Sequence, residues 1–181
     1  MEILNVTSRY RPHVGGVESH VAELAERFAD SGHDVTVFSA DAGTRVDNSD
    51  LPTVEERNGV RIRRFRSAAP GGAFHVAPGI APAVRRSSAD VIHAHNLHSL
   101  PLFFAALGRD STPLVVTPHY HGASASYIRD TFLSAYRPLG GWVLRRADAI
   151  VAVSKWEQRK LDVDFGVHAT VVPNGLDVAR F

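Results

Sequence analysis

Short runs of β-branched and apolar residues alternate with stretches of helical spacing along the whole chain, and this alternation constrains the fold more than any other feature. In a run such as Asp34–Phe38, apolar residues would face both sides of a strand, which is typical of a parallel strand covered by helices on both faces. We therefore predict an α/β, doubly wound, Rossmann-like domain with a mainly parallel sheet of about seven strands. The candidate strands are Ile3–Val6, Asp34–Phe38, Val60–Phe65, Asp90–His93, Leu114–Thr117, Ala149–Val153 and Ala169–Val172.

The first expected helix has the clearest pattern. Its apolar stripe consists of Val17, Val21, Leu24 and Phe28, which fall on one face at helical spacing. Gly32 follows the stripe at the position where a glycine commonly ends a helix. The sequence thus predicts an amphipathic helix directly after the first strand.

Two later segments carry helix-boundary signals. The segment Ser124–Arg146 is expected to form two helices, because Pro138–Gly141 should interrupt it. Further along, Ser154 and Glu157 fit a capping box, in which the serine caps the helix and the glutamate reaches back to the serine N–H.

Length and charge exclude several classes of protein. A chain of 181 residues with 44% hydrophobic and 22% charged residues fits one globular domain. The formal net charge of +1 gives no electrostatic basis for binding nucleic acid. The chain has no cysteine, which rules out disulfides and thiolate metal sites. We expect a cytoplasmic domain, because no apolar run is long enough to span a membrane and Met1–Asn5 does not resemble a secretory signal.

The basic run Arg61–Arg66 offers two interpretations. It could bind phosphate, but charged residues also protect an edge strand from unwanted pairing, and we favour a solvated edge strand. Residues 41–50 and 67–73 are polar and are expected to be surface loops.

A glycine pair lies where the first strand should lead into the first helix. Without side chains at Gly15 and Gly16, backbone N–H groups at the start of a helix can approach an anion closely. The spacing is not Gly-x-Gly-x-x-Gly, and no Gly-x-x-x-x-Gly-Lys-Ser/Thr occurs, so a dinucleotide-binding loop and a P-loop are not indicated.

Histidines form the second unusual feature. The chain has ten, and five of them lie at or after two expected strand ends: His93, His95, His98, His119 and His121. His93 and His95 are two residues apart and would share a face of the strand. They could be packed, hydrogen-bonded residues or zinc ligands, but neither loop contains a carboxylate, and we favour hydrogen bonding to sugar hydroxyls.

Several motifs, taken in order, resemble family 4 glycosyltransferases, which have the two-domain GT-B architecture. The first are Gly15–Glu18 followed by His20-Val21 and Leu24-Ala25, and then Gly32–Val37. The later ones are Asp90–His95, Val116–His119, Ala147–Ser154 and Val172–Asp177. Each is weak singly, but together they span almost the whole chain at similar spacing.

The resemblance implies a retaining glycosyltransferase that moves a hexosyl group from a nucleotide diphosphate sugar to a lipid, phosphosugar or glycan. In that family no metal ion and no other cofactor is needed. Residues 1–181 would be the N-terminal, acceptor-side domain, and Asn174 and Gly175 would be the hinge to a donor-binding C-terminal domain that the chain lacks. The isolated domain is therefore expected to be inactive, and the full-length protein could work at the inner face of the membrane.

The same resemblance assigns roles to individual residues. His119 would face the transferred sugar as the catalytic residue. The loop near the donor phosphates and the acceptor would comprise Gly15, Gly16 and Glu18. Acceptor contacts would come from Asn96, His98 and Tyr120. Because these residues follow strand ends, we expect Gly15, Gly16, Asn96, His119 and Tyr120 to line one cleft.

Other functions remain as alternatives. A non-catalytic module that binds a glycan or an anion is the main one, because half of the enzyme would be missing. An epimerase or a sugar-phosphate synthase of the same architecture comes next. A nicotinamide-dependent dehydrogenase is last, because the glycine spacing is wrong.

Overall fold

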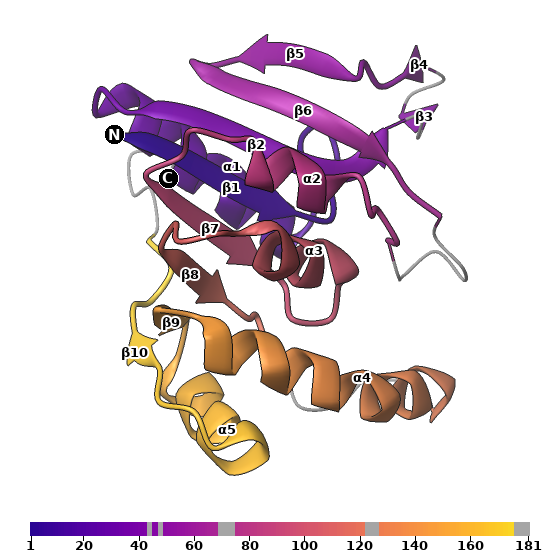
Figure 1. The fold of residues 1–181 in the computed structure, drawn as a ribbon, viewed down its shortest axis with the longest axis vertical. Coiled ribbons are helices and arrows are strands. Elements are labelled where there is room, and N and C mark those ends of the chain that lie inside the picture. The colour runs from indigo at the N-terminus through magenta and orange to yellow at the C-terminus, as the bar shows by residue number, and fades with distance from the viewer. Residues whose placement is uncertain (43–44, 47–48, 69–74, 122–126, 176–181) are drawn as a thin grey trace, which may run out of the picture.

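A computed structural model describes residues 1–42, 45–46, 49–68, 75–121 and 127–175 (Figure 1). Its main sheet has eight strands in the order β10-β9-β8-β7-β1-β2-β6-β5, and all neighbours are parallel except β5 and β6. The main-sheet strands are β1 (Glu2–Thr7), β2 (Asp34–Ala42), β5 (Val54–Arg57), β6 (Val60–Arg66), β7 (Val91–His95), β8 (Leu114–Thr117), β9 (Ala149–Ala152) and β10 (Thr170–Val171). A separate antiparallel pair is formed by β3 (Arg45–Val46) and β4 (Ser49–Asp50). The helices are α1 (Gly16–Asp30), α2 (Ile80–Arg85), α3 (Leu100–Gly108), α4 (Tyr127–Arg146) and α5 (Lys155–Phe165).

The strand order confirms the predicted doubly wound α/β fold. The chain starts in the middle of the sheet at β1, runs outward through β2 and β6, and returns to the other side of β1 as β7. The direction of winding thus reverses between β1 and β7, and in open parallel sheets ligands bind at such a reversal, beyond the carboxyl ends of the strands. The loops after β1, β7 and β8 meet at this rim.

All seven predicted strands are present, and three strands were not predicted: β5 in the main sheet, and the pair β3 and β4 within the segment 41–50, which was expected to be a loop. β5 pairs antiparallel with the outer side of β6. The turn between them contains Asn58 and Gly59, which both have positive φ angles, as a two-residue hairpin turn of type I′ requires. The Asn-Gly pair was the signal that could have predicted this hairpin.

The position of β6 corrects the interpretation of the basic run. β6 lies between β2 and β5, so it is not an edge strand. Its side chains alternate, with Arg61 and Arg63 exposed and Ile62 and Arg64 buried. A charge on the inner face of a strand is unusual, and Arg64 has a structural role described below.

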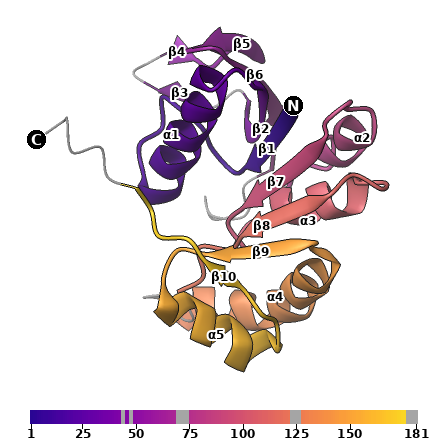
Figure 2. The same cartoon turned by 90° about the vertical axis from the view of Figure 1, so that its left-hand side faces the viewer.

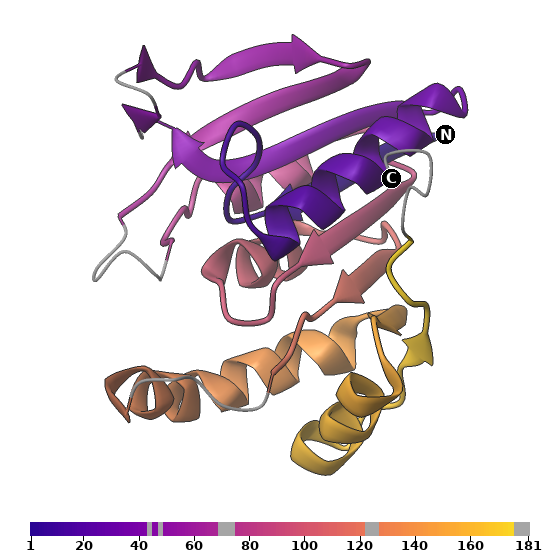
Figure 3. The same ribbon diagram turned by 180° about the vertical axis from the view of Figure 1, so that it is seen from behind.

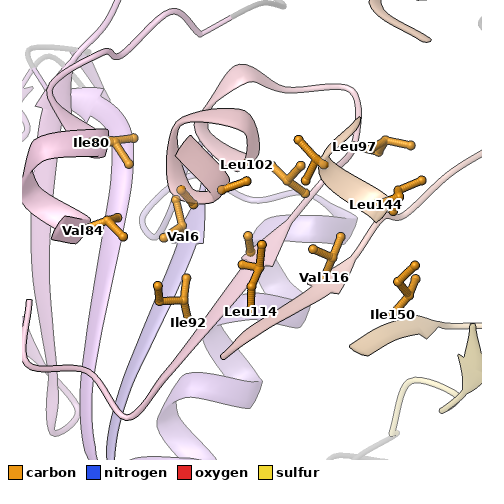
Figure 4. Close-up of a cluster of buried hydrophobic side chains, with 14 of the residues drawn as sticks. Val6, Ile80, Val84, Ile92, Leu97, Leu102, Leu114, Val116, Leu144 and Ile150 are labelled. Carbon is orange, nitrogen blue, oxygen red and sulfur yellow. The ribbon is translucent and has the colours of Figure 1, made fainter. Parts of the chain in front are cut away.

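The helices divide between the two faces of the sheet (Figures 2 and 3). α1 covers one face above a small core, and α2 and α3 lie on the opposite face. The larger core lies between the sheet and α2, α3, α4 and α5, as the close-up in Figure 4 shows in part. Its labelled members are Val6, Ile80, Val84, Ile92, Leu97, Leu102, Leu114, Val116, Leu144 and Ile150.

The first helix forms as predicted. Val21 is fully buried, while Val17 and Phe28 pack against the same small core. Leu24 is only half-buried. The helix ends before Gly32, which has a φ of +83° and so takes the left-handed conformation that glycine adopts without strain.

The prediction of two helices in the segment Ser124–Arg146 is wrong. α4 continues from Tyr127 to Arg146 with Pro138 inside it. A proline removes one hydrogen bond from a helix, but tertiary packing can override this local cost. The packing is visible just after the proline, where Val143 and Leu144 are buried in the larger core. Within the described residues, no helix has the length and apolar character needed to cross a membrane.

Candidate functional site

The loop between β1 and α1 presents an open backbone at the rim. Gly16 is exposed, and a Cβ atom added to it would meet nothing within 4 Å. A Cβ at Gly15 would come within 2.3 Å of a carboxylate oxygen of Glu18, which is the far end of a flexible side chain. Among the described residues, no packing contact therefore requires a glycine at position 16, and the start of α1 is a position at which N–H groups can bind a ligand with negative charge.

A buried ion pair fixes the loop that precedes these glycines. The guanidinium of Arg64 lies 3.2 and 3.3 Å from the two carboxylate oxygens of Asp41, and both side chains are fully buried. Arg64 also donates to the carbonyl of Arg11 at 2.8 Å. Asp41 accepts from the N–H of Tyr10 at 3.1 Å and from the hydroxyl of Ser39 at 2.6 Å. The predicted surface loop at 41–50 thus begins with a buried carboxylate, and the network holds the chain that leads to Gly15.

The two histidines of β7 share a face of the sheet, as predicted. His93 Nε2 lies 2.8 Å from the hydroxyl oxygen of Thr117 on β8. His95 Nε2 lies 3.2 Å from the carboxamide oxygen of Asn5 on β1. α1 lies over this face and adds a third ring, because the centroid of His20 is 5.9 Å from that of His95. His20 was not among the residues for which the sequence predicted a role.

His119 follows β8 and joins this cluster. Its φ of +49° is uncommon for a residue with a side chain, and such strain is found mainly at functional sites. Its ring is buried and lies edge-on to His20, with 5.0 Å between the centroids. Its Nε2 atom is buried and has no hydrogen-bond partner within the described residues. A buried polar atom without a partner costs free energy, and a bound water or ligand at this nitrogen would offset that cost.

The histidines of the site are neutral at pH 7. Burial, and then the neighbouring His20, lowers the pKa of His119 to about 3. Burial also lowers the pKa of His93 to about 4 and that of His95 well below its ordinary value. The pKa of His20 is lowered by burial as well. Each ring therefore offers one N–H donor and one lone-pair acceptor.

The predicted acceptor residues lie on adjacent loops, but they point in different directions. Asn96 has a φ of +69°, and its carboxamide oxygen accepts from the N–H of His98 at 3.1 Å. The ring of His98 stacks on Tyr120 with 5.4 Å between centroids. Tyr120 is buried in the larger core, and its hydroxyl donates to Asp164 of α5 at 2.8 Å. The Tyr120 ring therefore packs against His98, and its hydroxyl is directed toward α5 and not toward the rim.

The loop after β8 is held by a residue from α5. The Ser154 hydroxyl accepts from the N–H of Glu157, so the predicted cap is present. The second half of the prediction, a hydrogen bond from the Ser154 N–H to the Glu157 carboxylate, is wrong. Instead, this carboxylate accepts from the N–H of Val153 at 2.7 Å and from the N–H of Tyr120 at 2.6 Å. The buried Glu157 thus fixes the backbone next to His119.

A pocket of about 430 Å³ opens along α1 beside the cluster. It is bounded by α1, the ends of β7–β9 and the segment 172–175, which passes α1 in Figure 2. Its lining residues are Gly16, Ser19, His20, Glu23, Leu24, Arg27, Phe28, His93, Thr117, Val151, Val153, Val172, Pro173, Asn174 and Gly175.

The predicted cleft of five residues is thus only partly assembled. Gly16 lines this pocket together with the predicted hinge residues Asn174 and Gly175. His119 adjoins it through His20, whereas Tyr120 lies in the core.

Comparison with known proteins identifies relatives of the chain. The family model described as Glycosyltransferase Family 4 matches residues 14–180. The chain is 31% identical to the phosphatidyl-myo-inositol mannosyltransferase of Mycolicibacterium smegmatis over 170 residues, which are 92% of this chain and 42% of that protein. It is 33% identical to the D-inositol 3-phosphate glycosyltransferase of Geodermatophilus obscurus over 188 residues, again 92% of this chain and 40% of that protein.

Solved structures show the same fold. The sucrose-phosphate synthase of Thermosynechococcus elongatus superimposes with a TM-score of 0.70 at 17% identity, covering 99% of this chain and 49% of the other. HepE of Anabaena, in complex with UDP and glucose, gives a TM-score of 0.68 at 19% identity and covers 99% and 46%. The chain spans about half the length of the relatives it matches. Because the family model covers more than half of its residues, the chain belongs to Glycosyltransferase Family 4.

Proposed function

We propose that the chain is the N-terminal, acceptor-side half of a retaining glycosyltransferase that uses a nucleotide diphosphate sugar. The observation that carries the proposal is His119, a buried neutral imidazole with a positive φ angle, whose Nε2 atom has no partner among the described residues. Family membership supports it, as do relatives named as mannosyltransferases and a structural neighbour that holds UDP and glucose.

Different site residues would contact different parts of the donor. The donor diphosphate would lie against the N-terminus of α1, where Gly16 leaves the backbone open. Negative charge grows on this leaving group during transfer, so N–H groups already pointing toward it stabilise the transition state. The neutral His119 would donate or accept one hydrogen bond at the transferred sugar, and it would orient the sugar without acting as a base.

The acceptor would approach over the loops after β7 and β8, near Asn96 and His98. A lipid, a phosphosugar or a glycan fits this proposal, and a lipid acceptor would bring the protein to the inner face of the membrane. The second half of the enzyme, which holds most of the donor, would follow Gly175, the last described residue. The transfer would need no resident metal ion and no cofactor.

The test is a panel of nucleotide sugars offered to the full-length protein with lipid, phosphosugar and glycan acceptors, scored by nucleoside diphosphate release. We expect release with one donor class, undiminished by a chelator, and retention of configuration in the product. The 181 residues alone should bind nucleotide sugars weakly. Tight binding of a glycan by the full-length protein without any release would instead support the non-catalytic module.

A further inference from the structure

Three imidazoles from three different elements converge beside the pocket. His20 comes from α1, His95 from β7 and His119 from the loop after β8. One ring nitrogen from each lies within 4.8 Å of the other two. The convergence is a product of the tertiary fold, because the three residues are separated by 75 and 24 positions in the sequence.

Two of these rings carry a nitrogen for which the described residues supply no partner. His119 Nε2 and His95 Nδ1 are both buried and make no hydrogen bond. The other nitrogen of His95 lies 3.2 Å from the carboxamide oxygen of Asn5, which can only accept. With Nε2 donating to Asn5, Nδ1 of His95 is left as a lone pair. Ligating histidines commonly have their tautomer fixed by such a second contact.

We propose that His20, His95 and His119 form a binding site for a zinc-like divalent ion, with one imidazole nitrogen from each as ligand. Three neutral nitrogen donors suit Zn²⁺, Co²⁺ or Ni²⁺ and do not suit Mg²⁺ or Ca²⁺, which prefer oxygen. A tetrahedral zinc ion with bonds of about 2.0–2.1 Å needs nitrogens about 3.3 Å apart. The three nitrogens must therefore move closer together when an ion binds, and His20 is half-buried on α1, whereas His95 and His119 are buried.

The site has an entrance and an open coordination position. His20 lines the 430 Å³ pocket, so an ion reaches the cluster from that side. The three histidines supply three ligands, and water from the pocket supplies the fourth, as in catalytic zinc sites with three protein ligands. All three rings are neutral at pH 7, so binding does not first require the loss of protons.

The ion would act as an inhibitor of the proposed transfer, and this consequence rests on the proposed function. A lone pair of His119 that coordinates a metal ion is no longer available to the sugar. Zn²⁺ should therefore suppress the reaction reversibly, while Mg²⁺ should not. The binding site itself can be tested without any assay of transfer.

The test is a titration of the 181-residue chain with Co²⁺, whose visible absorption intensifies in tetrahedral nitrogen coordination, followed by displacement with Zn²⁺ and calorimetry of Zn²⁺ binding. We expect one ion per chain. His20→Asn should weaken Zn²⁺ binding by at least tenfold, and Asn5→Leu should weaken it about 10–100-fold through loss of the tautomer-fixing contact. His168→Asn removes an exposed histidine outside the cluster and should leave affinity unchanged.

Circular dichroism and thermal unfolding show which variants remain folded, and His20→Asn, which alters a half-buried side chain, is the variant most easily tolerated. The proposal is overturned if no tetrahedral Co²⁺ band forms, or if folded His20→Asn and His168→Asn bind Zn²⁺ equally well. Zn²⁺ binding without any transferase activity in the full-length protein would leave the site standing and contradict the proposed function alone.

Discussion

Two polar clusters lie within the same rim, and they use polarity in opposite ways. Around Arg64 and Asp41, opposite charges are buried together, and their hydrogen bonds hold the loop before Gly15. Around His119 and His95, the rings are neutral, and within the described residues two buried ring nitrogens lack partners. The first cluster is scaffold, in which both Asp41 oxygens are paired although Arg64 Nε is not, whereas the second leaves ring nitrogens at which a ligand can bind.

The largest effect is expected when the scaffold loses its cation. Arg64→Met would leave the Asp41 carboxylate buried without its guanidinium, and the free energy of unfolding should fall by about 3–5 kcal/mol. Arg61→Met is the matched control on the same strand, because Arg61 is exposed and its ion pair with Asp34 should contribute no more than about 1 kcal/mol. Urea unfolding of both variants measures the difference. Equal decreases in the free energy of unfolding for the two variants would mean that the buried ion pair contributes no more to stability than the exposed one.

A change in the second cluster should reduce turnover. His119→Ala in the full-length protein removes a hydrogen bond proposed to form at the transferred sugar, so kcat and kcat/KM should fall together by roughly a hundredfold to a thousandfold, or about 2.7–4 kcal/mol. Nucleotide affinity should change little. Steady-state kinetics and calorimetry separate the two quantities, with His168→Ala as the surface control. Near-normal turnover would make His119 a packed residue at a strand end.

Acid should weaken the fold through the neutral histidines. Burial, followed by the neighbouring His121, lowers the pKa of His98 to about 4, below its ordinary value of 6.5. Because the folded-state pKa of His98 lies below the unfolded-state value, the free energy of unfolding keeps its full value above pH 6.5. It falls as the pH is lowered toward 4, because the unfolded chain then binds the proton more readily. The loss is up to about 1.4 kcal/mol per pH unit for one histidine. His98→Gln should therefore unfold with a shallower dependence on pH between 6.5 and 4 than His168→Gln, measured by denaturant titration at several pH values. Identical slopes would show that His98 is not held neutral by the fold.

The smallest effect on stability is expected at Gly16. An added methyl group meets none of the described residues within 4 Å, and alanine suits a helix better than glycine, so Gly16→Ala should raise the free energy of unfolding by at most about 1 kcal/mol. The same methyl group would occupy the space proposed for the donor diphosphate, so turnover should fall. Thermal unfolding and diphosphate release, measured on the same variant, test whether stability rises while turnover falls. A variant that keeps full turnover would place the diphosphate elsewhere.

The elements that local pattern controls were predicted well. Seven parallel strands and α1 follow from runs of apolar residues and from helical spacing, and each was found. The errors lie where local and tertiary preferences disagree. Pro138 should end a helix, but packing of Val143 and Leu144 into the core keeps α4 continuous. β5 was missed because Val54–Arg57 is short and mostly charged, although Asn58-Gly59 marked its turn.

The structure brings some of the predicted site residues together and leaves others apart. Gly16 and His119 lie on the same side of the sheet because α1 covers the face to which the β7 histidines point. The side-chain direction of Tyr120 could not be deduced, because it depends on Asp164 and on the ring of His98. Glu157 was assigned to its own helix cap, and its contact with the backbone of Tyr120 links residues 37 positions apart.

The order and type of the main elements, the strand ends at which polar residues gather, and the family to which those motifs belong all follow from the sequence alone. These properties depend on the spacing of residues close together in the chain, and spacing is visible without coordinates. Only the tertiary structure decided that Arg64 is buried against Asp41, and that His20 meets His95 and His119. Both sets of contacts join strands and helices that are distant in sequence. They depend on the register of the strands and on the packing of α1 against the sheet, and neither is visible in the spacing of neighbouring residues.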